Sequence, residues 1–261
     1  RAYYDLGVRY MTLTHNVTLD WADAALDSAK HGGLTPFGKE VVREMNLLGM
    51  LVDLAHVSPA TMSAALDVSE APVIFSHSGS RALVDHPRNV PDSILARLPK
   101  NGGIVMVPFV NSFVSREVHA HDLARDSAAK EAARKYSKDT AAVAREMHAW
   151  VAAHPPVVAS LSQVADHIEH VRDVAGIDHV GIGSDFDGIE DVIPGLENVS
   201  RFPYLLAELA RRGWSDADLR KVTGENFIRV YTRAEAVSAR LRKERAPSTA
   251  TIEAASGSVN P

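Results

Sequence analysis

The chain has 261 residues, of which 46% are hydrophobic and 23% charged, and it carries a net charge of -5. This length and composition suit one large globular domain with a substantial core. No basic block suggests nucleic acid as a partner, and no apolar run approaches the roughly 20 residues that cross a membrane. The sequence therefore does not support membrane association. Because cysteine is absent, any metal must be held by His, Asp or Glu side chains.

Five apolar runs predict β-strands, and helical patterns separate most of them. The runs span 7–14, 51–55, 72–76, 103–108 and 179–184. This alternation predicts a parallel α/β sheet, either doubly wound or a (β/α)8 TIM barrel. The first strand lacks the glycine-rich loop of a doubly wound nucleotide binder, and polar residues close four of the five runs, which favours a barrel. Five strands cannot close a barrel, so we expect these to be its last five.

Capping signals mark the helices between the runs. Thr35 and Pro36 predict the start of a helix that Gly49 ends, with the apolar residues 37, 41, 45 and 48 on one face. Ser58 and Pro59 predict the start of the crossover helix that follows the run at 51–55. Strand, helix and strand in succession predict parallel neighbours.

The expected domain covers residues 1–245. Within it, residues 115–155 are charged and rich in alanine, which predicts a helical insertion with solvated faces. A further helix opens at Ser160 or Ser162. Past residue 245 the composition turns to Pro, Ser, Thr, Ala and Gly, so we expect a disordered tail at 246–261.

Potential metal ligands and acid–base groups close several of the predicted strands. Three runs end in a histidine, at His15, His56 and His77, and the last ends in Asp185. Because the carboxyl ends of parallel strands meet on one rim, we expect these side chains to lie together. His56 and His77 on neighbouring strands suggest a metal that activates water. Asp185 could then move a proton, His15 could stabilise charge on the attacked carbonyl, and Arg88 could clamp a substrate carboxylate.

A less specific interpretation competes with this one. His56 and His77 could be partly buried histidines with satisfied hydrogen bonds, and Arg88 an ordinary surface arginine. Asp53 is a weaker candidate for holding a metal ligand in place, and Asp187 for binding substrate or turning the backbone. Structural or solvated roles are expected for the remaining histidines of the middle segment, which are His119, His121, His148, His154, His167, His170 and His179.

Seven blocks of sequence, in the same order, resemble the renal (membrane) dipeptidase family of zinc peptidases. They lie at 6–16, 21–23, 33–46, 52–58, 75–78, 88–92 and 183–188. The resemblance implies a bacterial-type member with a TIM barrel of the amidohydrolase-like metal-dependent hydrolase type. It also implies two zinc ions in a complete site and hydrolysis of dipeptides, some with a D-residue on the C-terminal side.

The resemblance assigns a role to each residue of the rim. His56 and His77 match the two histidines that bind one zinc. His15 matches the histidine that contacts the substrate and steadies the tetrahedral intermediate, and Arg88 matches the arginine that binds the terminal carboxylate. Asp185 matches the aspartate near the free amino group, a proton carrier. The expected catalytic residues are thus His15 and Asp185, and the expected substrate-binding residues are His15, Arg88 and Asp185.

Three further zinc ligands of the family, a His-x-Asp pair and a bridging glutamate, have no match here. We therefore expect a partial dipeptidase domain that binds zinc weakly and is inactive alone. Two alternatives remain, which are a related amidohydrolase acting on another amide or lactam, and a metal-free, non-catalytic remnant. The family implies a dipeptide as partner and a possible homodimer. The cellular location stays open, with the periplasm or export favoured over the cytoplasm.

Overall fold

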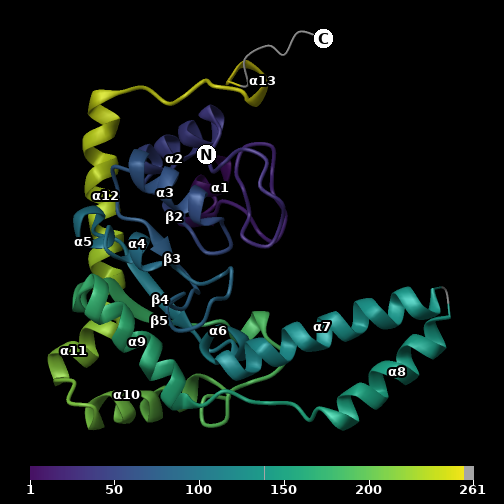
Figure 1. The fold of residues 1–261 in the computed structure, drawn as a ribbon. Coiled ribbons are helices and arrows are strands. Elements are labelled where there is room, and N and C mark those ends of the chain that lie inside the picture. The colour runs from purple at the N-terminus through teal and green to yellow at the C-terminus, as the bar shows by residue number, and fades with distance from the viewer. Residues whose placement is uncertain (138, 256–261) are drawn as a thin grey trace.

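A computed structural model describes residues 1–137 and 139–255. Its strands form one parallel sheet in the order β1-β2-β3-β4-β5 (Figure 1). The strands are β1 (Tyr10–Thr12), β2 (Leu51–Asp53), β3 (Ile74–Phe75), β4 (Ile104–Pro108) and β5 (Val180–Ser184). Each lies inside one of the predicted runs, so all five are confirmed. The sequential order is that of a barrel, since a doubly wound sheet reverses its strand order. Among the described residues the sheet is open, and β1 and β5 are its two edge strands.

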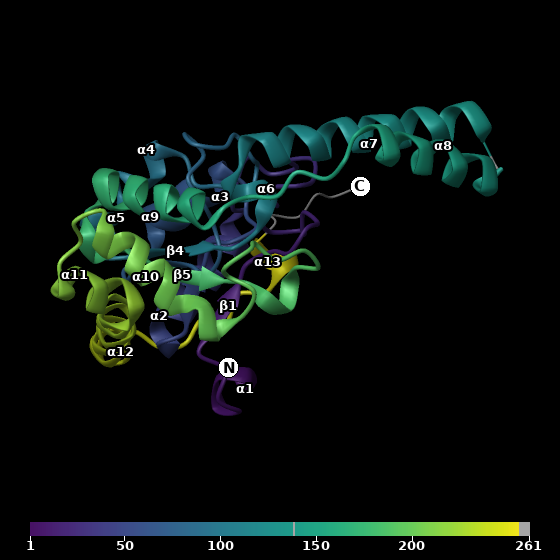
Figure 2. The ribbon, with the colours of Figure 1, turned by 90° about the horizontal axis from the view of Figure 1, so that it is seen from below.

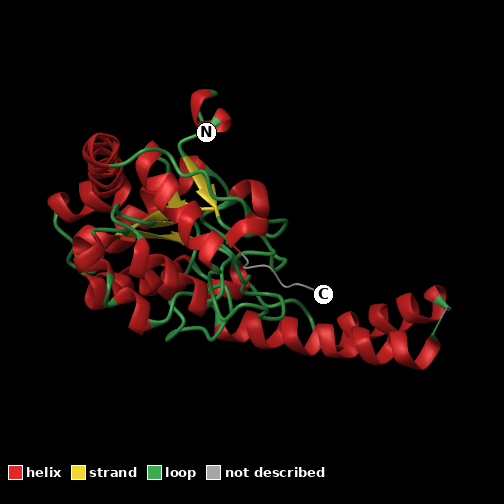
Figure 3. Cartoon of the chain, turned by 90° about the horizontal axis from the view of Figure 1, so that it is seen from above, coloured by secondary structure: helices red, strands yellow, loops and turns green. Residues whose placement is uncertain are grey.

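Helices surround this small sheet (Figure 3). The first half of the chain contains α1 (Ala2–Asp5), α2 (Pro36–Leu48), α3 (Pro59–Val68), α4 (Asp92–Leu95), α5 (Leu98–Asn101), α6 (Asn111–Val114) and α7 (Arg116–Tyr136). The second half contains α8 (Thr140–Ala153), α9 (Leu161–Ala175), α10 (Phe202–Arg211), α11 (Asp216–Arg220), α12 (Asn226–Glu244) and α13 (Ile252–Ala255). No described helix is both long and apolar enough to span a membrane.

Two apolar clusters fix the orientation of the sheet. Alternate strand residues such as Val52, Phe75 and Val105 are buried in the main core together with apolar residues of α2, α3 and α9. The first residues of β2, β3 and β4 pack instead on Val230 and Ala234 of α12. Helix α12 therefore closes the amino-terminal end of the sheet and leaves the carboxyl ends of the strands to the loops.

The predicted helix caps are present. The Thr35 hydroxyl accepts a hydrogen bond from the backbone N–H of Gly38, and Gly49 ends α2 with a left-handed φ of 87°. The Ser58 hydroxyl likewise accepts from the N–H of Thr61 at the start of α3. Each cap satisfies backbone groups that the helix itself leaves unpaired. The crossover between β2 and β3 therefore forms where the sequence predicts it.

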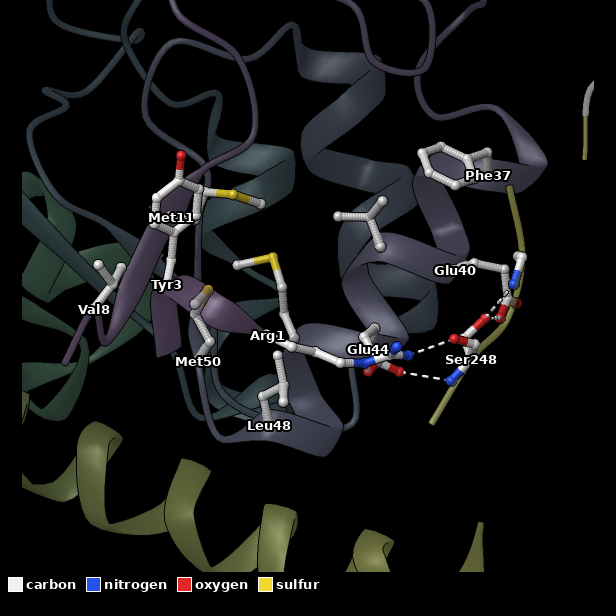
Figure 4. Close-up of a pocket in the computed structure, with 13 residues that line it drawn as sticks. Arg1, Tyr3, Val8, Met11, Phe37, Glu40, Glu44, Leu48, Met50 and Ser248 are labelled. Carbon is white, nitrogen blue, oxygen red and sulfur yellow. Dashed lines mark hydrogen bonds and ion pairs between the residues drawn. The ribbon is translucent and has the colours of Figure 1, made fainter. Parts of the chain in front are cut away.

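The apolar face of α2 contacts both the main core and an open cavity. This cavity of about 650 Å³ lies beside the free edge of β1 and is lined by Phe37, Val41, Met45 and Leu48 (Figure 4). Near it, Ser248 of the C-terminal segment donates its N–H to a Glu44 carboxylate oxygen at 2.8 Å. It is larger than the cavity at the predicted site, but its walls contain none of the predicted site residues.

Helices α7 and α8 form a paired arm that projects from the body (Figures 1 and 2). They occupy the segment for which a helical insertion is predicted, and few of their described residues are buried.

The C-terminal segment differs from the prediction of a disordered tail, because α13 forms at Ile252–Ala255 and Ser248 is hydrogen-bonded. The last part of the predicted tail, 256–261, lies outside the described residues.

A buried histidine connects α9 to the loop after β3. His167 is 1% exposed, and its Nδ1 accepts the backbone N–H of Ser80 at 2.9 Å. Burial, reinforced by the nearby His170, lowers the pKa of His167 from 6.5 to about 3. Between these values the unfolded chain binds a proton that the folded chain does not, so the free energy of unfolding falls as the pH falls.

We expect this histidine to contribute to acid instability. Lowering the pH from 7 to 4.5 should cost about 2–3 kcal/mol of unfolding free energy through His167 alone. Urea denaturation of wild type and His167→Asn at both pH values measures the difference. An equal loss of stability in both proteins would contradict the assignment.

Candidate metal centre

The predicted rim residues surround one cavity at the carboxyl ends of the strands. Its volume is about 520 Å³, and its walls include His15, His56, His77, Arg88 and Asp185. These residues follow β1, β2, β3 and β5, whose parallel pairing brings residues 170 positions apart to one place. The structure therefore brings these five predicted site residues together.

Two imidazole nitrogens meet at the wall of this cavity. The Nε2 atoms of His56 and His77 are 2.9 Å apart, and the two rings meet edge to face at a centroid distance of 4.9 Å. The exposed His15 ring lies next to His56, with a distance of 4.4 Å between the two ring centroids. The three histidines thus form a continuous imidazole wall.

The partner of His56 determines which of its nitrogens carries the proton. His56 Nδ1 lies 3.0 Å from Asn16 Oδ1, and an amide oxygen can only accept. Nδ1 therefore donates its N–H to Asn16, and Nε2 presents its lone pair to the cavity. A fixed tautomer of this kind is typical of a histidine that ligates metal.

A second chain of hydrogen bonds fixes His77 in the same way. The Ser76 hydroxyl donates to Asp53 Oδ2 at 2.6 Å and lies 2.7 Å from His77 Nδ1. Since its one proton goes to the carboxylate, the hydroxyl oxygen accepts from His77 Nδ1–H. Asp53 is completely buried, and its Oδ1 accepts the N–H of Ser76 at 2.9 Å. His77 Nε2 is therefore also unprotonated.

Electrostatics keep both rings neutral. Burial, and then the nearby Arg88, lowers the pKa of His56 to about 3 and also lowers that of His77. Two lone pairs therefore face each other across 2.9 Å. Such an arrangement suits a cation placed between or beside them, and neutral imidazole nitrogen is a good ligand for zinc. The unprotonated Nε2 atoms of the two histidines therefore suit a metal ion.

The described residues supply only part of a metal site. Within 1–137 and 139–255, no three His, Asp or Glu side chains form a group able to hold a metal ion. Structural and catalytic zinc sites normally use three or four protein ligands. His56 and His77 offer two unprotonated nitrogens, which is fewer than such a site uses.

Arg88 is a buried cation with unused donors. It is only 4% exposed, so the interpretation as a surface arginine is wrong. One guanidinium nitrogen donates to the His77 carbonyl at 3.4 Å, Nε has no partner among the described residues, and the group lies 5.2 Å from the centroid of the Phe113 ring. Burial lowers the pKa of Arg88 to about 10, which leaves it charged at neutral pH. A buried cation with free N–H groups lining a cavity suits an anionic ligand.

Asp185 reaches the cavity through an unusual turn. Strand β5 ends at Ser184, and both Ser184 and Asp185 have left-handed φ values, 45° and 78°. His56 shares this conformation, with φ at 68°. Left-handed backbone is costly for residues other than glycine and often occurs at functional sites. Gly183 has to be glycine, because a Cβ there would lie 2.5 Å from the Ser76 carbonyl oxygen.

Other predictions fall outside the cavity. Asp187 is exposed in a short 3-10 turn and does not line it. The same is true of the histidines for which structural roles were expected. Asn16 and Ser76, which fix the two tautomers, were not predicted. A signal existed for both, since each polar residue is directly adjacent to a candidate histidine.

Sequence comparison identifies relatives of this chain. A family profile described as Membrane dipeptidase (Peptidase family M19) matches residues 1–245. The chain is 42% identical over 237 residues to an uncharacterised dipeptidase of Schizosaccharomyces pombe, covering 90% of this chain and 49% of that protein. It is 41% identical over 240 residues to the dipeptidase tcpJ of Claviceps purpurea, covering 92% and 48%. The chain thus spans about half the length of these curated relatives.

Solved structures share the fold. The probable dipeptidase PvdM of Pseudomonas aeruginosa superposes with a TM-score of 0.78 at 27% identity, covering 90% of this chain and 65% of that one. A metallo peptidase of Rhodobacter sphaeroides, liganded with a phosphinate mimic of L-Ala-D-Ala, gives 0.68 at 23% identity, covering 89% and 57%, and this likeness concerns the fold alone. Pseudomonas aeruginosa is a bacterium, in line with a bacterial-type member, and a metallopeptidase family implies a metal cofactor. The chain belongs to the membrane dipeptidase family, Peptidase family M19.

Proposed function

We propose that this chain is the substrate-binding and metal-binding part of a zinc-dependent dipeptidase. One observation carries the proposal. Two imidazoles whose tautomers are fixed present unprotonated Nε2 atoms to a cavity that also contains a buried, incompletely paired guanidinium. A metal position and an anion position thus share about 520 Å³, which suits a substrate as small as a dipeptide.

His56 and His77 would hold one zinc ion, with further ligands from outside the described residues. Zinc, when bound, polarises a carbonyl and lowers the pKa of a water molecule. Family membership and the donor set both support this assignment. A complete site with two zinc ions is part of the same proposal.

The remaining side chains position the substrate and move protons. Arg88 would bind the terminal carboxylate through its free N–H groups. Asp185, which lines the same cavity, would accept a proton from water and return it to the leaving amine. His15 stands exposed beside His56 and would donate to the carbonyl oxygen as negative charge develops there.

The metal assignment can be tested by the zinc content of the chain. Protein purified without chelator is equilibrated with zinc and assayed by elemental analysis, alongside the double variant His56→Ala/His77→Ala. We expect weak binding by wild type and none by the double variant. His170→Ala is the matched control, because His170 pairs with Asp92 at 2.9 Å outside the cavity. Equal zinc in the double variant and wild type would contradict the proposal.

One further outcome of this experiment and a separate hydrolysis assay distinguish the alternatives. Nearly two tightly bound zinc ions would mean that a second polypeptide or another copy supplies the missing ligands, and dipeptide assays should follow at once. In the whole protein, hydrolysis of glycyl-D-alanine but not of its C-terminal amide would support a dipeptidase. Equal hydrolysis of both would favour another amidohydrolase, and hydrolysis of neither by a zinc-free protein would favour a non-catalytic remnant.

A further inference from the structure

The loop that carries Arg88 is organised by a histidine to which no role has been given. In the sequence His86-Pro87-Arg88-Asn89, the N–H of Asn89 donates to the His86 carbonyl at 2.9 Å, which closes a turn. Proline at the second position is favoured in such turns because its φ is already set. Within this turn, the backbone N–H of Arg88 donates to Nδ1 of the His86 side chain at 3.1 Å.

This side-chain contact reproduces the geometry of an Asx turn. Asn and Asp commonly accept a hydrogen bond from the backbone two residues further along, and here an imidazole nitrogen does so. The contact fixes the backbone at Arg88, and the long side chain extends from there to the cavity. Because the acceptor must be an unprotonated nitrogen, His86 acts here as a neutral ring with Nδ1 free of hydrogen.

The ring itself is held between two aromatic neighbours. Its centroid lies 4.3 Å from that of Phe113 in α6 and 4.8 Å from that of His119 in α7. Phe113 in turn lies beneath the Arg88 guanidinium at 5.2 Å and lines the cavity. His86 thus contacts both the backbone of Arg88 and the aromatic surface on which its charged group rests.

The surroundings of His86 favour the neutral form. Burial first, and then three facing cations or potential cations, His119, Arg88 and Arg81, together lower its pKa to about 3. Asp85, the neighbouring carboxylate, is paired with Arg81 at 2.7 Å. The acceptor nitrogen is therefore unprotonated at neutral pH.

We propose that His86 is a positioning residue for Arg88, and that its Nδ1 acceptor sets the direction in which the guanidinium meets a carboxylate. The inference rests on the proposed function for the part that concerns dipeptide binding. It also gives the paired arm a role, because His119 in the first turns of α7 contacts the His86 ring.

Three variants separate the acceptor from the ring. His86→Asn keeps an acceptor for the Arg88 N–H but loses the aromatic ring. His86→Phe keeps the ring between Phe113 and His119 but loses the acceptor, and His86→Ala loses both. His170→Ala again serves as a matched control, since it removes an imidazole outside the cavity.

The first measurement follows Arg88 itself and needs no ligand. Hydrogen exchange of the Arg88 amide, measured by NMR in the 261-residue chain, should accelerate about fivefold to tenfold in His86→Ala and His86→Phe. His86→Asn should restore slow exchange, and the Arg88 Nε–H resonance should move in the two acceptor-free variants only. Unchanged exchange in His86→Phe would overturn the proposal, and so would equal acceleration in His86→Asn and His86→Ala.

The second measurement connects this position to binding. Affinity for glycyl-D-alanine, measured by calorimetry, should fall about tenfold in the acceptor-free variants and stay near wild type in His86→Asn. Unchanged affinity in His86→Phe would show that the acceptor does not direct the guanidinium. If neither wild type nor any variant binds the dipeptide, the proposed function fails for this chain. The exchange data and the Nε–H resonance then decide whether His86 positions Arg88.

Discussion

Replacing Arg88 by methionine should stabilise the fold and at the same time weaken dipeptide binding by about 100-fold. The guanidinium is almost fully buried, yet among the described residues its hydrogen-bond acceptor is the His77 carbonyl at 3.4 Å, and Nε has no partner there. A buried charge of this kind has lost its hydration without a full set of partners. Methionine fills similar space beside Phe113 and removes that cost, which should raise the unfolding free energy by about 1–3 kcal/mol.

Both halves of this prediction are measurable. Urea denaturation gives the stability of wild type and Arg88→Met, and calorimetry or, in the whole protein, KM gives the effect on the dipeptide. Arg97→Met is a suitable control, because Arg97 contacts Ser63 and an exposed Asp67 carboxylate away from the cavity. A variant that is less stable than wild type would show that the guanidinium has structural partners after all. Unchanged dipeptide affinity would show that Arg88 does not bind the dipeptide.

Replacing Asp53 by asparagine should weaken zinc binding by about 10- to 100-fold with little change of shape. In the wild type, Asp53 Oδ1 accepts two backbone N–H groups, from Ala55 and Ser76. Oδ2 accepts the hydroxyls of Thr12 and Ser76, each at 2.6 Å. Asparagine keeps its oxygen toward the two N–H groups, so its NH2 group faces the hydroxyls.

The consequence is a reversed hydrogen bond at His77. The Ser76 hydroxyl then accepts from the new amide and has to direct its own proton to His77 Nδ1. That nitrogen becomes the acceptor, Nε2 takes the proton, and a protonated Nε2 cannot ligate metal. Zinc affinity measured by competition with a chromogenic chelator reports the change.

Thr12→Val is the matched control for Asp53→Asn. It removes a hydrogen bond to the same Asp53 oxygen but leaves the contact between Ser76 and His77 in place. We expect it to lower stability while keeping zinc affinity close to wild type. Equal zinc affinity in Asp53→Asn and Thr12→Val would show that the proton position on His77 is not set through Ser76.

The strands and the rim of the site follow from sequence patterns. A parallel strand covered on both faces is a continuous apolar run, as in the segment that contains β2, and caps such as Thr35 and Ser58 mark where helices begin. Topology alone then brings His56 and His77 together, because neighbouring parallel strands end on the same side. These features are local or depend only on strand order.

The orientation of individual side chains depends on distant partners and could not be predicted. Arg88 is buried because Phe113, from a helix beyond the next strand, lies against it. Asn16 and Asp53 act on histidines through contacts across strands, and no periodicity encodes such contacts. The same limit applies to α2, where Ser238 of α12 donates to the Leu47 carbonyl at 2.7 Å from 191 residues away. That contact helps decide which face of α2 is buried.

The left-handed backbone at His56 and Asp185 also has an evolutionary consequence. Both residues sit in a conformation that glycine would adopt at lower cost, and both lie at the carboxyl ends of strands. Natural selection for stability alone would therefore tend to replace them, together with the buried Arg88. Substitutions that raise stability would therefore tend to remove side chains of the proposed site. Selection on what the proposed site binds would be needed to retain them.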